Sequence, residues 1–197
     1  GHGRSQQVRS GYDVSTMCGD LEALTDGYTE PLTLVGHSYG ALISLEFARR
    51  HPERVDKLVV VDAPLPPAQT ADLTGFLRLK PDEMVDALPA PLQAAVNNGG
   101  RRMNRLLRSL MFLAGETDLL SAIDNRPAHT DEELAEVTCP TLLVFGRSSS
   151  CLPAGERLAR VLPNAELVTL DGGHYLPVEA AGALTDAITR FLGVPNG

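Results

Sequence analysis

The fold of this chain is decided by the stretch Leu32-Thr33-Leu34-Val35-Gly36-His37-Ser38-Tyr39-Gly40-Ala41. A short apolar run ends at a Gly-x-Ser-x-Gly turn, and a helical pattern follows it. In this strand–turn–helix context the turn is so tight that the serine backbone is forced to a positive φ, beside a helix N-terminus. We therefore expect a strained turn at Ser38, with Gly36 and Gly40 where side chains would clash. The alternative is a glycine-bounded turn with an incidental serine.

Composition limits the class of protein. With 197 residues and 43% hydrophobic content, the chain can bury the core of one domain. A net charge of -8 and a pI near 5.1 argue against nucleic acid or an anionic membrane surface as a partner. An odd number of widely spaced cysteines, without a Cys-x-x-Cys pair, favours a reduced, cytoplasmic compartment. They are Cys18, Cys139 and Cys151.

Strand and helix patterns alternate on both sides of one long insertion. Apolar, β-branched runs at 55–61, 141–145 and 166–170 are typical of buried strands, and helical patterns lie between them. This alternation predicts an α/β fold with a mostly parallel sheet flanked by helices. Residues 65–137 are rich in proline and short helical patterns, including an amphipathic helix over 101–113 with a solvated basic face. We expect a core of 1–64 and 138–197 and a helical insertion over 65–137.

Three motifs in combination resemble the α/β-hydrolase fold family. They are the opening Gly1-His2-Gly3-Arg4-Ser5, the Gly36–Gly40 elbow, and the loop around His174, and the resemblance extends from residue 1 to the C-terminus. It implies an α/β-hydrolase core with 65–137 as a helical cap. It also implies that the N-terminal part is missing, because in the family several strands precede the opening motif. Those strands would be absent, removed by processing, or supplied by a second polypeptide.

The elbow strand points the same way. The run Leu32–Val35 is typical of a strand buried on both faces in the middle of a parallel sheet. Without a strand before it, this run becomes an exposed apolar edge that invites pairing with another chain. We therefore expect residues 1–197 to need a further segment or polypeptide to fold stably.

A serine hydroxyl needs a base before it can act as a nucleophile, so Ser38 requires a histidine. Only His174 lies in a glycine-flanked loop between the last strand and the last helix, and it matches the family's catalytic position. The alternative is a structural histidine. His37, the variable residue of the elbow, is assigned to packing, to a contact with the missing loop or to substrate binding, and His51 to a helix end. The other two are His2 in the opening loop and His129 in the insertion.

The acid is assigned by position. The loop after the next-to-last strand, 146–152, contains no carboxylate, whereas Asp62 ends the strand that follows the elbow and could reach Nδ1 of His174. The sequence resembles small carboxylesterases of the family with a Ser–Asp–Ser–His tetrad. That resemblance makes Ser149 the fourth member, with Ser148 as the fallback. The alternatives are a turn-capping Asp62 and an ordinary loop hydroxyl at Ser149.

Stabilising a developing oxyanion takes two donors. The N–H of Tyr39, immediately after Ser38, is expected to be one of them. In the family the second comes from a loop that this chain does not contain. The chain alone is therefore expected to lack roughly 2.7–4 kcal/mol of transition-state stabilisation.

These assignments predict a serine hydrolase that uses neither metal nor cofactor. Ser38 attacks a small-molecule carboxylic ester, thioester or lactone to form an acyl-enzyme, and water activated by His174 cleaves it. The apolar insertion favours a hydrophobic acyl or alkyl group. Two alternatives stay open: a carbon–carbon bond hydrolase with the same site, and a non-catalytic subunit of a two-chain assembly or a binding scaffold.

Overall fold

The computed structural model describes residues 5–66, 71–88, 90–97 and 101–194, which divide into two compact units. The sheet unit comprises the described residues of 14–69 and 127–197, and the helical unit those of 1–13 and 70–126. The insertion predicted from the sequence covered 65–137. The helical unit begins later and ends earlier than that range, and it also includes residues from the start of the chain. Residues 1–4, which carry most of the opening motif and His2, lie outside the described residues.

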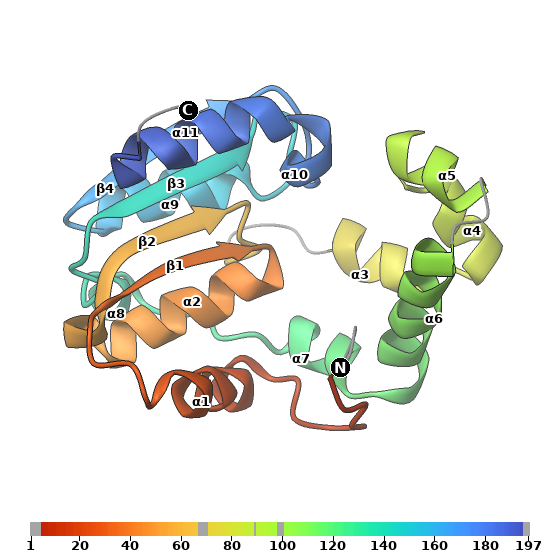
Figure 1. The fold of residues 1–197 in the computed structure, drawn as a ribbon, viewed down its shortest axis with the longest axis horizontal. Coiled ribbons are helices and arrows are strands. Elements are labelled where there is room, and N and C mark those ends of the chain that lie inside the picture. Colours follow the sequence, from red (N-terminus) through yellow and green to blue (C-terminus); the bar gives the residue numbers. More distant parts are fainter. Residues whose placement is uncertain (1–4, 67–70, 89, 98–100, 195–197) are drawn as a thin grey trace. The chain divides into compact units, whose positions relative to one another are not determined.

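In the described part of the chain, four parallel strands form the sheet, in the order β1-β2-β3-β4 (Figure 1). They are β1 (Leu32–His37), β2 (Val55–Val61), β3 (Thr141–Gly146) and β4 (Ala165–Leu170). The register aligns their carboxyl ends: His37 pairs with Val61, Val61 with Val144, and Gly146 with Leu170. The residues that follow the strands therefore meet along one edge of the sheet. This confirms the predicted parallel α/β fold.

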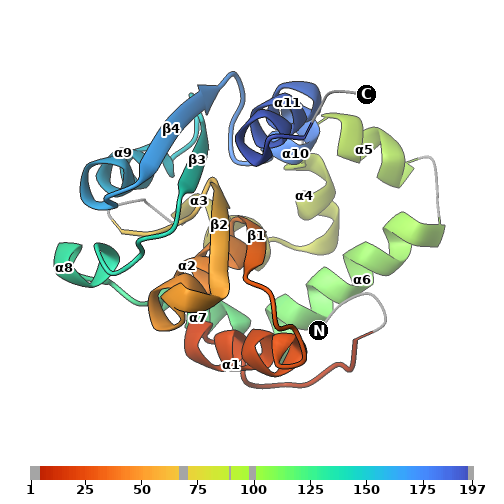
Figure 2. The same ribbon diagram turned by 60° about the vertical axis from the view of Figure 1, so that its left-hand side comes forward.

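Helices cover both faces of the central strands. Successive side chains of a strand point to opposite faces, so alternate residues pack against different helices. Leu58, Val60, Leu143 and Phe145 pack with α1 (Val14–Thr25), α2 (Tyr39–Arg50) and α9 (Leu152–Val161). Val59, Val61, Leu142 and Val144 pack with α10 (Leu176–Glu179) and α11 (Ala181–Leu192). Figure 2 shows α9 and α11 on opposite sides of β3 and β4.

Strand β1 lies at the edge of the sheet, as expected for this chain, but its burial differs from the prediction. It lies at the end of the strand order, and α2 packs against it. Leu32 and Leu34 face the core as half-buried residues, whereas Thr33 is exposed and Val35 is 54% exposed. The interpretation of Leu32–Val35 as a strand buried on both faces is therefore wrong for one face. Among the described residues, no helix covers that face of β1.

Two short helices complete the sheet unit. The 3₁₀ helix η1 (Pro52–Arg54) precedes β2, and α8 (Asp131–Leu134) lies in the segment that follows the helical unit in the chain. Thr130 caps α8: its hydroxyl accepts the N–H of Glu133, whose carboxylate accepts the N–H of Thr130 at 2.8 Å. This cap sets Leu134 and Val137 into the core of the sheet unit, where both are buried.

The described residues of the helical unit form five helices. They are α3 (Ala71–Arg78), α4 (Pro81–Asp86), α5 (Ala90–Asn97), α6 (Arg101–Glu116) and α7 (Leu119–Asp124). The predicted helix over 101–113 is thus present and runs to Glu116. The Asp118 carboxylate binds the N-terminal segment to this unit, because it accepts the N–H groups of Gly11 and Tyr12 at 2.9 and 3.2 Å. None of the helices described is both long and apolar enough to cross a membrane.

Candidate active site

Ser38 occupies the tight turn between β1 and α2. Its backbone adopts φ 55 and ψ -125, and its N–H donates to the carbonyl of Val61 at 2.9 Å. A Cβ on Gly36 would lie 2.5 Å from the carbonyl oxygen of Gly40, so only glycine fits there. A Cβ on Gly40 itself would meet no described atom within 4 Å. The strain expected at Ser38 and the close approach expected at Gly36 are present, while the clash expected at Gly40 is not.

The loop between β4 and α10 carries His174 to this turn. Nε2 of His174 lies 2.8 Å from Oγ of Ser38, although the two residues are far apart in sequence. The Ser38 hydroxyl makes no capping hydrogen bond to α2, so it remains directed at the imidazole. The carboxylate of Glu179 holds the loop by accepting the N–H of Gly173 at 2.7 Å. The loop therefore sets His174 in hydrogen-bond contact with Ser38.

Asp62 follows β2 and lies fully buried beside His174. Its Oδ2 accepts the Nδ1–H of His174 at 2.7 Å, and its Oδ1 accepts the N–H of Gly146 at 2.9 Å. Its backbone has φ 48, a left-handed conformation that aspartate tolerates better than most residues. Its own N–H donates to the carbonyl of Val144 at 2.9 Å. The carboxylate thus reaches across to the histidine and to β3.

The two candidate serines of the loop after β3 have different partners. Ser149 donates its O–H to Oδ2 of Asp62 at 2.5 Å and accepts the N–H of Cys151 at 3.1 Å. Ser148 is exposed and donates to the carbonyl of Gly172 at 2.8 Å. Of the two, Ser149 is the one in contact with the carboxylate. Ser38, His174, Asp62 and Ser149 form one continuous hydrogen-bonded series.

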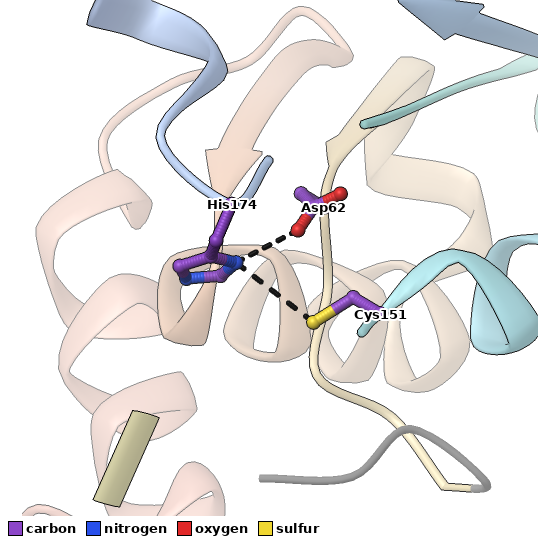
Figure 3. Close-up of side chains that lie close together, drawn as sticks. All are labelled: Asp62, Cys151 and His174. Carbon is purple, nitrogen blue, oxygen red and sulfur yellow. Dashed lines mark hydrogen bonds and ion pairs between the residues drawn. The ribbon is translucent and has the colours of Figure 1, made fainter. Parts of the chain in front are cut away.

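Sequence reasoning did not place Cys151 at this site. Its Sγ lies 3.8 Å from Nδ1 of His174, and the side chain is 3% exposed (Figure 3). The position of Cys151, two residues after Ser149 in the same loop, was the available signal. Asp62, Cys151 and His174 offer ligand atoms within 4.8 Å of one another, a spacing that a metal ion could use. However, N and O ligands on a tetrahedral ion with bonds of 2.0–2.1 Å are about 3.3 Å apart. The 2.7 Å between Nδ1 and Oδ2 fits a charge-assisted hydrogen bond instead.

The two other elbow residues flank the nucleophile. Tyr39 is the first residue of α2, so its N–H belongs to the positive end of that helix. His37 is the last residue of β1, and its Nε2 lies 2.8 Å from the backbone oxygen of His174. The contact of His37 with the His174 loop differs from the expected packing, contact with the missing loop or substrate binding.

The remaining described histidines lie in other contacts. His51 follows α2 and contacts the carboxylate of Glu22 at 2.9 Å. His129 lies in the sheet unit, where its Nε2 is 3.2 Å from Oε2 of Glu46. Both therefore pair with carboxylates of other elements, while His174 contacts the elbow serine.

Comparison with known proteins defines the family. The family model described as "alpha/beta hydrolase fold" matches residues 1–113. The "Putative carbamate hydrolase RutD" of Pseudomonas savastanoi pv. phaseolicola is 31% identical over 88% of this chain and 73% of its own length. The "2-hydroxy-6-oxononadienedioate/2-hydroxy-6-oxononatrienedioate hydrolase" of Cupriavidus pinatubonensis is 26% identical over 83% and 63%. A thermophilic esterase from Thermogutta terrifontis superimposes with a TM-score of 0.71 and 25% identity, over 98% of this chain and 76% of that one.

The chain belongs to the α/β-hydrolase fold family. The three relatives named above are hydrolases, which indicates an enzyme.

Proposed function

We propose that the chain is a serine hydrolase that cleaves carboxylic esters, thioesters or lactones through an acyl-enzyme on Ser38. One observation carries the proposal: the hydrogen bonds from Ser38 to His174 and from His174 to Asp62, at 2.8 and 2.7 Å. Nucleophile, base and orienting acid stand within the reach that proton transfer requires. The strained backbone of Ser38 supports the proposal, because such strain clusters at active sites.

The proposed reaction has two halves. In the first, Oγ of Ser38 attacks the carbonyl carbon while Nε2 of His174 takes the hydroxyl proton. Asp62 keeps the proton on Nδ1 and stabilises the imidazolium that forms. The imidazolium then protonates the leaving alkoxide, thiolate or, in a lactone, the ring oxygen. In the second half, His174 takes a proton from water, the hydroxide attacks the acyl-enzyme, and Ser38 regains its proton as the acid leaves.

Two further elements complete the proposal. The Tyr39 N–H and the N-terminus of α2 stabilise the oxyanion. Ser149 donates to Oδ2 of Asp62, the same oxygen that binds the imidazole, and so helps to fix the orientation of the carboxylate. We place the second oxyanion donor on a further segment or polypeptide, which would also cover the exposed edge at β1. The exposure of Val35 supports such a partner.

A second candidate reaction uses the same site on a carbon–carbon bond next to a carbonyl group. The relative from Cupriavidus pinatubonensis favours this candidate, because its name is that of an oxo-dienedioate hydrolase. The relative from Pseudomonas savastanoi extends the proposal to a carbamate carbonyl, which a serine can attack in the same way. All three reactions share the nucleophile and the base and differ in the leaving group.

Rapid-quench mass spectrometry with p-nitrophenyl acetate, p-nitrophenyl butyrate and a vinylogous 1,5-diketone separates the ester reaction from the carbon–carbon reaction. The ester proposal predicts a burst of p-nitrophenol and a protein carrying one acyl group on Ser38, both absent in Ser38→Ala. Cleavage of the diketone alone would favour the second candidate. A folded protein that turns over none of the substrates would contradict the proposal.

A further inference from the structure

We propose that His37 is a positioning residue: its Nε2–H holds the backbone carbonyl of His174 and so fixes the imidazole between Ser38 and Asp62. This inference rests on the proposed function, since it assigns His37 to the same reaction. It moves His37 from substrate contact to the support of the base. The assignment follows from three features of the site, which concern the strand, the loop and the charge state of the ring.

The first feature is that His37 belongs to a rigid element and adjoins the nucleophile. It is paired with Val61 in the β1–β2 ladder, and the next residue in the chain is Ser38. Its side chain reaches the carbonyl of His174 at 2.8 Å, and the two rings lie 5.1 Å apart. One residue of the sheet is therefore bonded covalently to the nucleophile and by a hydrogen bond to the base.

The second feature is how the backbone of the histidine loop is held on the two sides of His174. After it, the carbonyl of Tyr175 accepts the N–H groups of Val178 and Glu179 at 2.8 and 2.9 Å. Among the described residues, Ser148 donates to the carbonyl of Gly172, and Glu179 accepts the N–H of Gly173. Gly172 has φ 149, a conformation that other residues rarely adopt, so this part of the backbone turns sharply. The bond from His37 acts on the peptide carbonyl of His174 itself. Without it, rotation of this peptide would displace the imidazole.

Such a displacement matters because His174 makes two short bonds at once, one on each ring nitrogen. Moving the ring toward Ser38 lengthens the bond to Asp62, and moving it back lengthens the bond to Ser38. A misplacement of about 1 Å at a catalytic group costs on the order of 10²-fold in rate. A hydrogen bond to the backbone of the base therefore acts on the rate of the chemical step.

The third feature is the protonation of His37. A carbonyl oxygen only accepts hydrogen bonds, so Nε2 must carry a proton. Burial lowers the pKa of His37 below its ordinary value; the hydrogen bond to the His174 carbonyl and the Asp62 carboxylate act in the opposite direction. A neutral His37 suits the reaction, because a second cation beside the ring of His174 would destabilise the imidazolium. The ring thus serves as a neutral donor.

The test compares three variants with the wild type. His37→Phe keeps an aromatic ring of similar size and removes the donor, whereas His37→Gln keeps an N–H at a similar distance along the side chain. His51→Phe is the matched control, because His51 is another half-buried histidine of the sheet unit, outside the site. Each variant is assayed for kcat and KM with p-nitrophenyl butyrate and for thermal midpoint.

The inference predicts that kcat falls about 10- to 100-fold in His37→Phe, with KM within about twofold of the wild type. His37→Gln should recover most of the rate, and His51→Phe should keep it. A raised KM at unchanged kcat in His37→Phe would contradict the inference and indicate that His37 binds substrate. Equal losses in His37→Phe and His37→Gln would show a role in packing alone.

A spectroscopic arm separates this inference from the proposed function. The Nδ1 proton that His174 shares with Asp62 is a low-field NMR signal that can be observed without any substrate. It should weaken or shift in His37→Phe and return in His37→Gln, even if no ester is cleaved. An unchanged signal in His37→Phe would overturn the inference, whereas a wild type inert toward every ester would overturn the proposed function instead.

Discussion

At the scale of single residues, the Asp62 carboxylate is the most densely bonded group of the site. It is fully buried and accepts hydrogen bonds from the Gly146 N–H, the Ser149 hydroxyl and the His174 imidazole. A buried carboxylate without partners would be strongly destabilising, so these three donors account for its presence in the interior. They also aim Oδ2 at Nδ1, which keeps Nε2 of His174 ready to accept the proton of Ser38.

Replacing this carboxylate by an amide tests its role. Asp62→Asn should lower kcat by roughly 10³- to 10⁴-fold, because an amide cannot hold the required tautomer or stabilise the imidazolium. Asparagine tolerates the positive φ at this position, so the variant should fold. Steady-state kinetics of Asp62→Asn and the exposed control Asp56→Asn decide the matter. A rate near that of the wild type in Asp62→Asn would place the acid elsewhere.

The neighbouring serines offer a matched pair of substitutions. Ser149→Ala removes a hydrogen bond to the buried charge, and a loss of about 10-fold in kcat is expected from the usual strength of such a bond. Ser148→Ala removes an exposed bond to the Gly172 carbonyl and should cost less than about threefold. Both variants are measured on one ester substrate. If Ser148→Ala lost more activity than Ser149→Ala, the assignment of the fourth residue would be reversed.

At the scale of elements, the turn from β1 into α2 rests on one glycine. A Cβ on Gly36 would stand 2.5 Å from the Gly40 carbonyl oxygen and 2.7 Å from Cα of Ala41, both backbone atoms that cannot move aside. Gly36→Ala should therefore push α2 away from β1, lower the thermal midpoint and abolish labelling of Ser38. Gly40→Ala is the control, and it should be tolerated. Unchanged stability and labelling in Gly36→Ala would contradict this account of the turn.

The C-terminal half of α2 is held by a buried carboxylate. Glu46 is 4% exposed and lies within 3.2 Å of His129, Arg49 and Arg50. Burial by itself would raise the pKa of Glu46, but hydrogen bonds to these three residues outweigh it and lower the pKa from 4.5 to about 2. This network joins α2 to the segment that precedes α8 in the sheet unit.

The lowered pKa of Glu46 makes stability depend on pH with a defined sign. Because the folded-state pKa lies below that of the unfolded chain, the stabilisation is complete above about pH 4.5 and is lost as the pH falls toward 2. It amounts to at most about 3 kcal/mol. Thermal unfolding at pH 5 and pH 3 should show a larger fall for the wild type than for Glu46→Gln. Parallel curves for the two proteins would rule out this role of Glu46, and Glu136→Gln, at an exposed partner of Arg49, is the control.

At the scale of the whole chain, the features that could be predicted from sequence were the ones encoded locally. The β-branched runs and the Gly-x-Ser-x-Gly turn each consist of contiguous residues. The parallel sheet and the strained backbone of Ser38 could therefore be predicted from them. The meeting of Asp62 with His174 followed from a topological rule, because parallel strands end at one edge.

The missed features depend on contacts between distant segments. The exposure of Val35 depends on which helices cover β1. The contacts of Cys151 and His37 with His174 join the loop after β3 and the end of β1 to the loop after β4. No local pattern records such contacts. Residues 127–137 show the same limit: the segment resembles the insertion in composition, whereas Leu134 and Val137 are buried in the core of the sheet unit.

The central claim is that the fold directs the Ser38 hydroxyl at His174 as an activated nucleophile. The most direct measurement is labelling with a fluorophosphonate probe, followed by peptide mass spectrometry. The account predicts one adduct, on Ser38, that is absent in Ser38→Ala and forms far more slowly in His174→Gln. A folded wild-type protein that stays unlabelled, or that carries the adduct on another residue, would contradict it.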